Sequence, residues 1–341
     1  MKHSMDYTIQ FAQLLLSIPS PSGFTENAIQ LVKKESTLLG FESEITKKGN
    51  LIITVPGQTN HVLGLSGHVD TLGAMVKSIK STGDIKFTTI GGPIWPTLDG
   101  EYCTVQTRDG RRYTGTFLSE SPSSHVYKTA SSLERTPDTM YVRIDEVVKS
   151  KTDTEKLGIR PGDFIFFDPK TIVTESGFIK SRFLDDKISV AILMGLLQRI
   201  QQEKIVPIST LKIIISTYEE VGHGASFIPH VDELIAVDMG CIGEDLSCTE
   251  EMVSICCKDS SGPYDFHVTS KLVALATKHN LSFATDIYPF YGSDVSAALR
   301  GGNDLRGGLI GPGVQASHGM ERTHILAVYN TMELLLAYIT S

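Results

Sequence analysis

The spacing of hydrophobic residues changes twice along this chain. The changes divide the sequence into a main part, which lies on both sides, and an inserted segment between them. Near the amino end, residues 7–16 and 26–39 carry apolar positions at helical spacing, and Gly40 ends the second predicted helix. Two apolar runs follow at 51–55 and 62–66, and their continuous hydrophobic character predicts strands of a buried sheet. The first part of the chain therefore predicts helices packed on a sheet.

From about residue 71 to residue 162 the pattern changes to short β-rich segments separated by many turn residues, without a convincing long helix. The predicted β segments are 85–90, 102–107, 113–118 and 140–144. This texture predicts an inserted all-β domain, which we place at residues 72–163.

Alternation of helices and strands returns after Phe164. Strands are predicted at 211–217 and 234–237, and helices at 188–202, 272–279 and 327–338. Such alternation is typical of layered α/β folds. We therefore expect a layered α/β/α domain with a mixed sheet, made of residues 1–71 and 164–341 and interrupted by the β-rich insert.

Charge and composition exclude several classes of function. The chain has 31 Lys and Arg against 39 Asp and Glu, a formal net charge of −8, which argues against nucleic-acid binding. No apolar run reaches the length of a membrane span, and the amino end lacks the cleavage site of a signal peptide. Five cysteines without a C-x-x-C pair indicate reduced thiols. These features predict a cytoplasmic protein.

Acidic and imidazole residues recur where the predicted strands end. The residues that follow the three strands are His68, Asp70, Glu219, Glu220 and Asp238. Two further groups lie in predicted loops: Asp185 with Asp186, and His318 with His324. Because ligands of an open α/β sheet bind at the carboxyl ends of its strands, these residues are candidates for a single site.

Each of these residues alone has a plainer explanation, since a histidine after a strand is more often an ordinary core or surface residue. The set carries more weight, because carboxylates that share a cleft raise one another's pKa and destabilise the fold unless a cation is present. A pair of divalent ions would supply that positive charge. Nitrogen and oxygen ligands without cysteine favour zinc or cobalt, with manganese as a third choice.

Four segments resemble the M42 family of metallo-aminopeptidases. They are Gly-His-Val-Asp at 67–70, Leu-Asp-Asp-Lys at 184–187, Tyr-Glu-Glu-Val-Gly at 218–222 and Val-Asp-Met-Gly at 237–240. The resemblance spans nearly the whole chain, including the insert. It implies an aminopeptidase that acts on peptides with two divalent metal ions per subunit, and a homo-oligomer that in this family is often a dodecamer.

The same resemblance implies a set of metal ligands. His68 and Asp238 would bind one ion, Glu220 would bind the other, and Asp185 would bridge both. The last ligand is His318 or His324, because the family's Arg-Tyr-Ile-His segment reads Gln-Ala-Ser-His at 315–318 here. Spacing to the final helix favours His318.

The residues next to the ligands carry the expected catalytic roles. Successive side chains of an extended segment point to opposite sides, so one of Glu219 and Glu220 can bind metal while the other faces the attacking water. The sequence leaves open which does which, and the resemblance implies that Glu219 is the general base. It also implies that Asp70 orients a ligand. The segment Tyr-Gly-Ser-Asp at 291–294 resembles a substrate-side loop of the family, although a simple turn explains it equally well.

Two other classes of function remain open on the sequence alone. One is a different hydrolase on the same scaffold, either an amidase that removes blocking acyl groups or a glycosidase with paired carboxylates. The other is a non-enzymatic assembly protein in which the β-rich insert is the working part.

Overall fold

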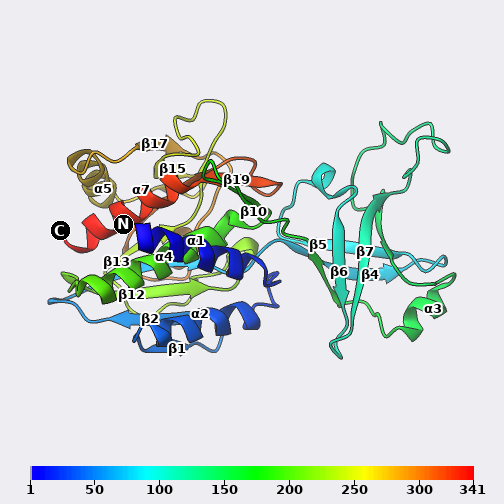
Figure 1. Cartoon of the computed structure of the whole chain (residues 1–341), viewed down its shortest axis with the longest axis horizontal. Helices are drawn as coiled ribbons and strands as arrows, with labels where there is room; N and C mark the ends of the chain where they lie inside the picture. Colours follow the sequence, from blue (N-terminus) through cyan, green and yellow to red (C-terminus); the bar gives the residue numbers. More distant parts are fainter. Residues whose placement is uncertain (1) are drawn as a thin grey trace. The chain divides into compact units, whose positions relative to one another are not determined.

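The computed structural model describes residues 2–341, which form two compact units (Figure 1). The first unit contains the chain up to Thr71 together with Lys170–Ser341, and the second contains Leu72–Pro169.

A large mixed sheet forms the centre of the first unit. Its strand order is β1-β2-β12-β3-β13-β18-β15-β16, with β14 beside β18 and β17 beside β15. The bounds are β1 Ser43–Ile45, β2 Leu51–Val55, β3 Thr59–His68, β12 Ser209–Ser216, β13 Glu233–Val237, β14 Gly240–Cys241, β15 Val253–Asp259, β16 Gly262–Pro263, β17 Phe283–Ile287 and β18 Arg306–Val314. The neighbours β12, β3, β13 and β18 are parallel, whereas β2 joins β12 and β15 joins β18 in antiparallel pairs.

The parallel strands are buried, as their continuous apolar sequences predict. Every residue of β18 after Arg306 is buried, and so is β13 after Glu233. Parallel strands of this kind need helices on their faces, because neither face can be left to water. The predicted α/β class with a mixed sheet is confirmed.

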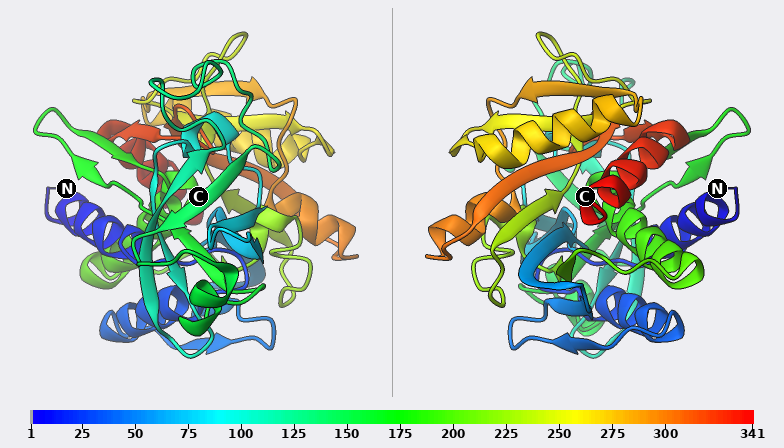
Figure 2. Two further views of the ribbon diagram at one scale, coloured as in Figure 1. Left: turned by 90° about the vertical axis from the view of Figure 1, so that its right-hand side faces the viewer. Right: turned by 90° about the vertical axis from the view of Figure 1, so that its left-hand side faces the viewer.

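Helices α1 (Lys2–Leu16), α4 (Leu184–Glu203) and α7 (Ile325–Ile339) lie side by side on this sheet, with α4 in the middle (Figure 2). Every α4 residue from 184 to 197 is buried, which is typical of a helix enclosed by protein. The other helices of the unit are α2 (Glu26–Leu38), α5 (Phe266–Lys278) and α6 (Asp294–Arg300). Across residues 2–341, every helix falls short of the length or the apolar character that a membrane span requires.

A small antiparallel sheet borders the start of α4. Its order is β10 (Ile172–Val173), β11 (Phe178–Ser181) and β19 (Glu321–His324). Strand β19 follows β18 through a tight loop and pairs with β11, with Glu321 opposite Ser181. This sheet therefore brings the 315–321 loop toward the segment that leads from β11 into α4.

The second unit is a closed β-barrel, which confirms the predicted all-β insert. Its strands run in the order β4-β5-β8-β7-β6-β9. Their bounds are β4 Gly73–Ile79, β5 Ile85–Ile90, β6 Tyr102–Gln106, β7 Arg112–Ser119, β8 Met140–Ile144 and β9 Phe164–Phe167, joined by the short helices η1 (Trp95–Leu98) and α3 (Lys151–Lys156). The boundary that we expected after residue 163 falls just before β9, and β9 closes the barrel by pairing with β4 and β6.

Candidate active site

Three neighbouring parallel strands deliver the first acidic and imidazole side chains to one edge of the sheet. His68 is the last residue of β3, Asp238 directly follows β13, and the short helix η2 (Glu219–Val221) follows β12. The Nε2 atom of His68 lies 3.7 Å from Glu219 Oε2 and 3.9 Å from Asp238 Oδ2. The structure thus brings together residues that are up to 170 positions apart in sequence.

Asp185 lies between two histidines at the start of α4. Its Oδ1 atom is 3.1 Å from His68 Nε2, and its Oδ2 atom is 3.6 Å from His318 Nε2. His318 Nε2 is also 3.6 Å from Glu220 Oε2. The two oxygens of one carboxylate therefore face two separate clusters, which is the arrangement that a bridging ligand requires.

Ligand atoms gather in two groups. One group is His68, Asp186 and Asp238, and the other is Asp185, Glu220 and His318; within each group the atoms lie within 4.8 Å of one another. Asp186 is joined to Asp185 by a cis peptide bond, and its Oδ2 atom already accepts the His68 backbone N–H at 3.0 Å. The other oxygen of Asp186, Oδ1, is buried without a hydrogen-bond partner among residues 2–341, but only Asp185 has oxygens next to both histidines, so Asp185 is the better candidate for a shared ligand.

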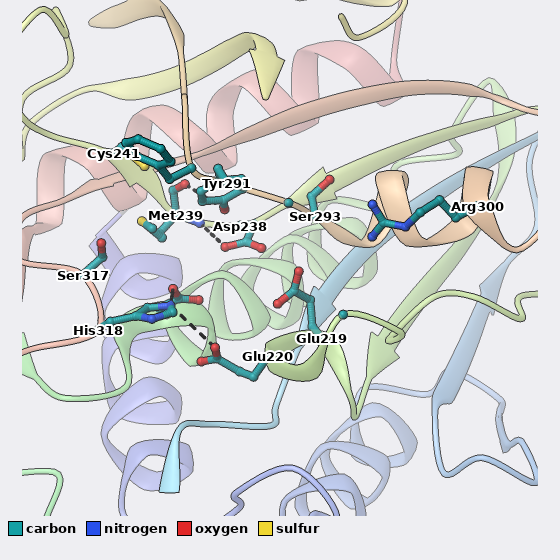
Figure 3. Close-up of a pocket in the computed structure, with 14 residues that line it drawn as sticks. Glu219, Glu220, Asp238, Met239, Cys241, Tyr291, Ser293, Arg300, Ser317 and His318 are labelled. Atoms are coloured by element: carbon teal, nitrogen blue, oxygen red, sulfur yellow. Dashed lines mark hydrogen bonds and ion pairs between the residues drawn. The ribbon is translucent and has the colours of Figure 1, made fainter. Parts of the chain in front are cut away.

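A pocket of about 320 Å³ opens beside these groups (Figure 3). Glu220 points toward His318 in this view, whereas Glu219 points toward Asp238, so the adjacent glutamates diverge. The rest of the wall includes Met239, Cys241, Phe290, Tyr291, Ser293 and Arg300. The pocket thus combines a strongly acidic floor with apolar, sulfur-containing and basic side chains.

Asp70 fixes the turn that carries the two glutamates. Its Oδ1 atom accepts the Glu219 N–H at 3.1 Å and its Oδ2 atom accepts the Glu220 N–H at 3.3 Å. Ser22 donates its hydroxyl to Oδ2 at 2.5 Å. The nearest partner of His68 Nδ1 is the Asp70 main-chain oxygen at 2.9 Å, and the carboxylate is farther away at 3.5 Å. Asp70 therefore orients His68 mainly through its backbone and the glutamates through its side chain.

The two candidate histidines of the last loop have different surroundings. His318 contacts Asp185 and Glu220, as given above, and lines the pocket. His324 instead accepts the Leu326 N–H on Nδ1 at 3.2 Å, which caps helix α7, and its Nε2 lies 2.9 Å from the Ser176 carbonyl oxygen. The structure brings His318 into the cluster and leaves His324 outside it.

Comparison with known families identifies the scaffold. A family model described as M42 glutamyl aminopeptidase matches residues 49–334, most of the chain. The chain belongs to the M42 peptidase family.

Relatives of this M42 peptidase agree with that membership. YhfE of Bacillus subtilis (strain 168), which is named provisionally as an aminopeptidase, is 47% identical over 343 residues, covering 99% of each chain. A TET aminopeptidase from Thaumarchaeota archaeon SCGC AB-539-E09 has a TM-score of 0.89 at 19% identity, over 98% of this chain and 96% of that one. The Pyrococcus horikoshii TET1 peptidase has a TM-score of 0.86 at 20% identity, over 98% and 99%. The protein is a peptidase, and the two structures share its fold.

M42 peptidases depend on metal, and the buried carboxylates of this one fit a cation. Burial, together with the nearby charge of Asp185, raises the pKa of Glu220 to about 8 and that of Asp238 to about 7. Burial also raises the pKa of Glu219 well above its usual value. The Oε1 atom of Glu220 is buried without a hydrogen-bond partner among residues 2–341. Cations would relieve this crowding of negative charge and satisfy that oxygen.

Histidine partners explain why Asp185 behaves differently from the other acids. Its burial favours the neutral form, but hydrogen bonds from His318 and His68 hold the pKa of its carboxyl below the usual value. Conversely, burial disfavours charge on His68, yet its bonds to Asp185 and Asp70 raise the pKa of the imidazole well above normal. Asp185 is thus the most acidic of the candidate ligands.

Sequence reasoning singled out Asp294 only as part of the 291–294 segment and missed its contacts with the segments around the two glutamates, as it missed those of Lys48. Asp294, the first residue of α6, accepts the Ala225 N–H at 2.9 Å and the Ser216 hydroxyl at 2.8 Å. Lys48 donates to the carbonyl oxygens of His223 and Gly224. No local pattern marks these residues, because each acts on a segment at least 69 positions away in the sequence.

Sequence reasoning also missed Glu321, which is 1% exposed. It is the first residue of β19, three positions after His318, and both of its carboxylate oxygens accept backbone N–H groups of the candidate site. A single acid within a run of polar residues gives no signal of such a role.

Proposed function

We propose that this protein is an aminopeptidase that releases the N-terminal residue of peptides with two divalent cations and with Glu219 as general base and acid. The observation that carries the proposal is the arrangement of Asp185, whose two carboxylate oxygens face His68 on one side and His318 on the other. One shared carboxylate between two nitrogen and oxygen clusters is the donor set of a two-metal hydrolase.

We assign three ligands to each proposed cation from the distances between the donor atoms. His68, Asp185 and Asp238 would hold one cation, and Asp185, Glu220 and His318 would hold the other. All donors are nitrogen or oxygen, which suits zinc or cobalt, with manganese as a further choice. Divalent cations at this site supply a Lewis acid for the scissile carbonyl and lower the pKa of water.

Glu219 is the group best placed to move the proton. Its side chain is 15% exposed, faces the pocket, and is directed away from the cluster that contains Glu220. It would take a proton from the attacking water and return it to the nitrogen of the leaving amine. Asp70 supports this step, because its carboxylate fixes the backbone N–H of Glu219 at 3.1 Å.

Cleavage at the amino end follows from the charge of the pocket. The floor presents several carboxylates, and the free α-ammonium of a peptide is a cation that can bind among those not neutralised by metal. A residue in the middle of a chain has no such charge. The site therefore favours hydrolysis of the first peptide bond.

Replacement of Glu219 by Gln tests the proposed base. The variant keeps size and hydrogen bonding but cannot accept a proton, so kcat should fall by about 10²–10⁴-fold with metal content unchanged. Turnover of an aminoacyl-p-nitroanilide and elemental analysis are the measurements. Glu244→Gln, in an exposed loop, is the control and should behave like the wild type. Full activity in the Glu219 variant would refute the assignment.

The proposal also covers the oligomeric state of the protein and its cellular compartment. Solved structures of the same fold include a TET1 dodecamer and a TET1 peptidase that forms a tetrahedron or an octahedral shell. We infer that this chain is also a homo-oligomer, and its native mass tests the point. Its free cysteines suit the reducing cytoplasm, where we place it.

A further inference from the structure

Glu321 connects the two segments that carry Asp185 and His318. Its Oε2 atom accepts the Asp185 N–H at 2.9 Å, and its Oε1 atom accepts the His318 N–H at 3.0 Å. The residue is 1% exposed and starts β19, where it pairs with Ser181 of β11. One buried side chain on a fixed strand thus sets the backbone of two residues whose side chains meet 3.6 Å apart.

At Asp185 the carboxylate of Glu321 accepts a backbone N–H that lies ahead of the regular part of helix α4. Asp185 and Asp186 have non-helical backbone angles, with ψ values of 102° and 21°, so the helical hydrogen-bond ladder does not fix this part of the chain. Glu321 reaches this N–H from 136 positions away in sequence. The direction of the Asp185 side chain therefore depends on Glu321.

At His318 the same carboxylate holds an unfavourable backbone conformation. His318 has a φ of 61°, and Ala316 two residues earlier has a φ of 58°. For a residue with a side chain the left-handed region is sterically unfavourable, so the loop needs contacts that keep it there. Glu321 supplies one, and Arg182 supplies another through Nη1, 3.4 Å from the Gly319 carbonyl oxygen.

Glu321 differs from the candidate ligands because backbone N–H groups occupy both of its carboxylate oxygens. Each of its oxygens lies on a backbone N–H, and it belongs to neither of the two ligand groups. Only a carboxylate can serve both N–H groups, because an amide has one accepting oxygen and its NH₂ would face the other N–H. The geometry at this position therefore requires two accepting oxygens.

We propose that Glu321 is a positioning residue, which holds Asp185 and His318 in the relative placement that the second cation needs. The inference rests on the two-cation site of the proposed function. It adds a residue that contacts neither the cation nor the substrate and acts only through two backbone N–H groups.

Titration of the metal-free full-length protein with Co²⁺ tests the proposal. The visible absorption of bound Co²⁺ reports coordination independently of turnover. In Glu321→Gln we expect the affinity of one of the two ions to fall about 10–100-fold, with an altered spectrum for that ion, since removing a residue that orients a ligand typically has this effect. The other ion should bind as in the wild type.

Asp286→Asn is the matched control. Asp286 is also buried, at 6% exposure, and its two oxygens also accept two backbone N–H groups, from Ser247 at 2.8 Å and Cys248 at 3.0 Å. It lies outside both ligand groups. Its replacement should lower the unfolding temperature and leave Co²⁺ affinity unchanged.

Several results would overturn the proposal. They are wild-type Co²⁺ affinity in Glu321→Gln, or an equal loss in both variants. Should Glu321→Gln fail to fold, Glu321→Asp replaces it, because the shorter side chain keeps its charge but cannot reach both N–H groups. If neither Glu321 variant folds while Asp286→Asn does, Glu321 is needed for folding and the proposal fails. If the wild type itself binds no Co²⁺, the proposed function fails first.

Discussion

At the scale of single residues, the acids around this pocket separate into two kinds by what their oxygens contact. The carboxylates of Asp70, Asp294 and Glu321 accept backbone N–H groups from the loops that carry the site. Glu220 has a buried oxygen without such a partner. An acid whose lone pairs are occupied by the main chain positions its neighbours, whereas one with an unoccupied oxygen is available to a cation. The hydrogen-bond pattern therefore distinguishes Glu220 from the three supporting acids Asp70, Asp294 and Glu321.

The two histidines of the last loop give a prediction at this scale. His318→Ala should lose metal and activity, because it removes a donor 3.6 Å from both Asp185 and Glu220. His324→Ala should keep metal but lose on the order of 1 kcal/mol of stability, since it removes the cap of α7. Elemental analysis and thermal unfolding distinguish the two outcomes. Metal loss only in the His324 variant would reverse the assignment.

At the scale of elements, the site depends on close contact between the segment after β13 and strand β18. The Asp238 N–H donates to the Ile310 carbonyl oxygen at 2.9 Å. A Cβ atom on the next residue, Gly311, would lie 1.3 Å from the Asp238 carbonyl oxygen. Only glycine permits this approach, so the sheet sets the position of Asp238 through a residue without a side chain.

Gly311→Ala should therefore damage both the fold and the site. We expect a loss of stability of at least about 1–3 kcal/mol, as in overpacked cores, together with reduced metal content. Gly243→Ala is the control, because its nearest neighbour is 3.9 Å away. Thermal unfolding and elemental analysis are the measurements. Wild-type stability and metal content in the Gly311 variant would show that β18 is free to move.

At the scale of the whole molecule, the fold brings acidic and imidazole side chains from four separate stretches of sequence together beside one pocket. His68, Asp185, Glu220 and Asp238 come from β3, α4, η2 and the end of β13. The sheet and the α1–α4–α7 layer hold these charges together although each carboxylate would be better solvated in the unfolded chain. The metal-free protein should therefore be less stable than the metal-bound one.

The pKa values of the acids predict how that stability varies with pH. Burial raises the pKa of Glu220 to about 8 and that of Asp238 to about 7, above the ordinary values of 4.5 and 3.8. Between about pH 4 and pH 8 the folded metal-free protein thus binds more protons than the unfolded chain, so its stability falls as pH rises. The raised pKa of His68 acts in the same direction.

Thermal unfolding after chelation measures this effect. The unfolding temperature should decrease between about pH 5 and about pH 8, and added Zn²⁺ or Co²⁺ should raise it most at the higher pH, because the ions bind the ionised carboxylates. An unfolding temperature of the metal-free protein that stays constant or rises with pH would contradict the prediction that buried negative charge destabilises the fold.

The sequence by itself determined the fold class, the β-rich insert and the edge of the sheet where the acids meet. These follow from local properties, since the spacing of apolar residues marks helices and strands, and parallel strands place their carboxyl ends at one edge. Only the tertiary structure decided which neighbours face each other. His318 and His324 have the same chemistry six positions apart, and a left-handed turn together with the pairing of β19 and β11 separates them. Glu321 and Asp294 likewise act on segments distant in sequence, and such contacts exist only once the sheet and helices have packed.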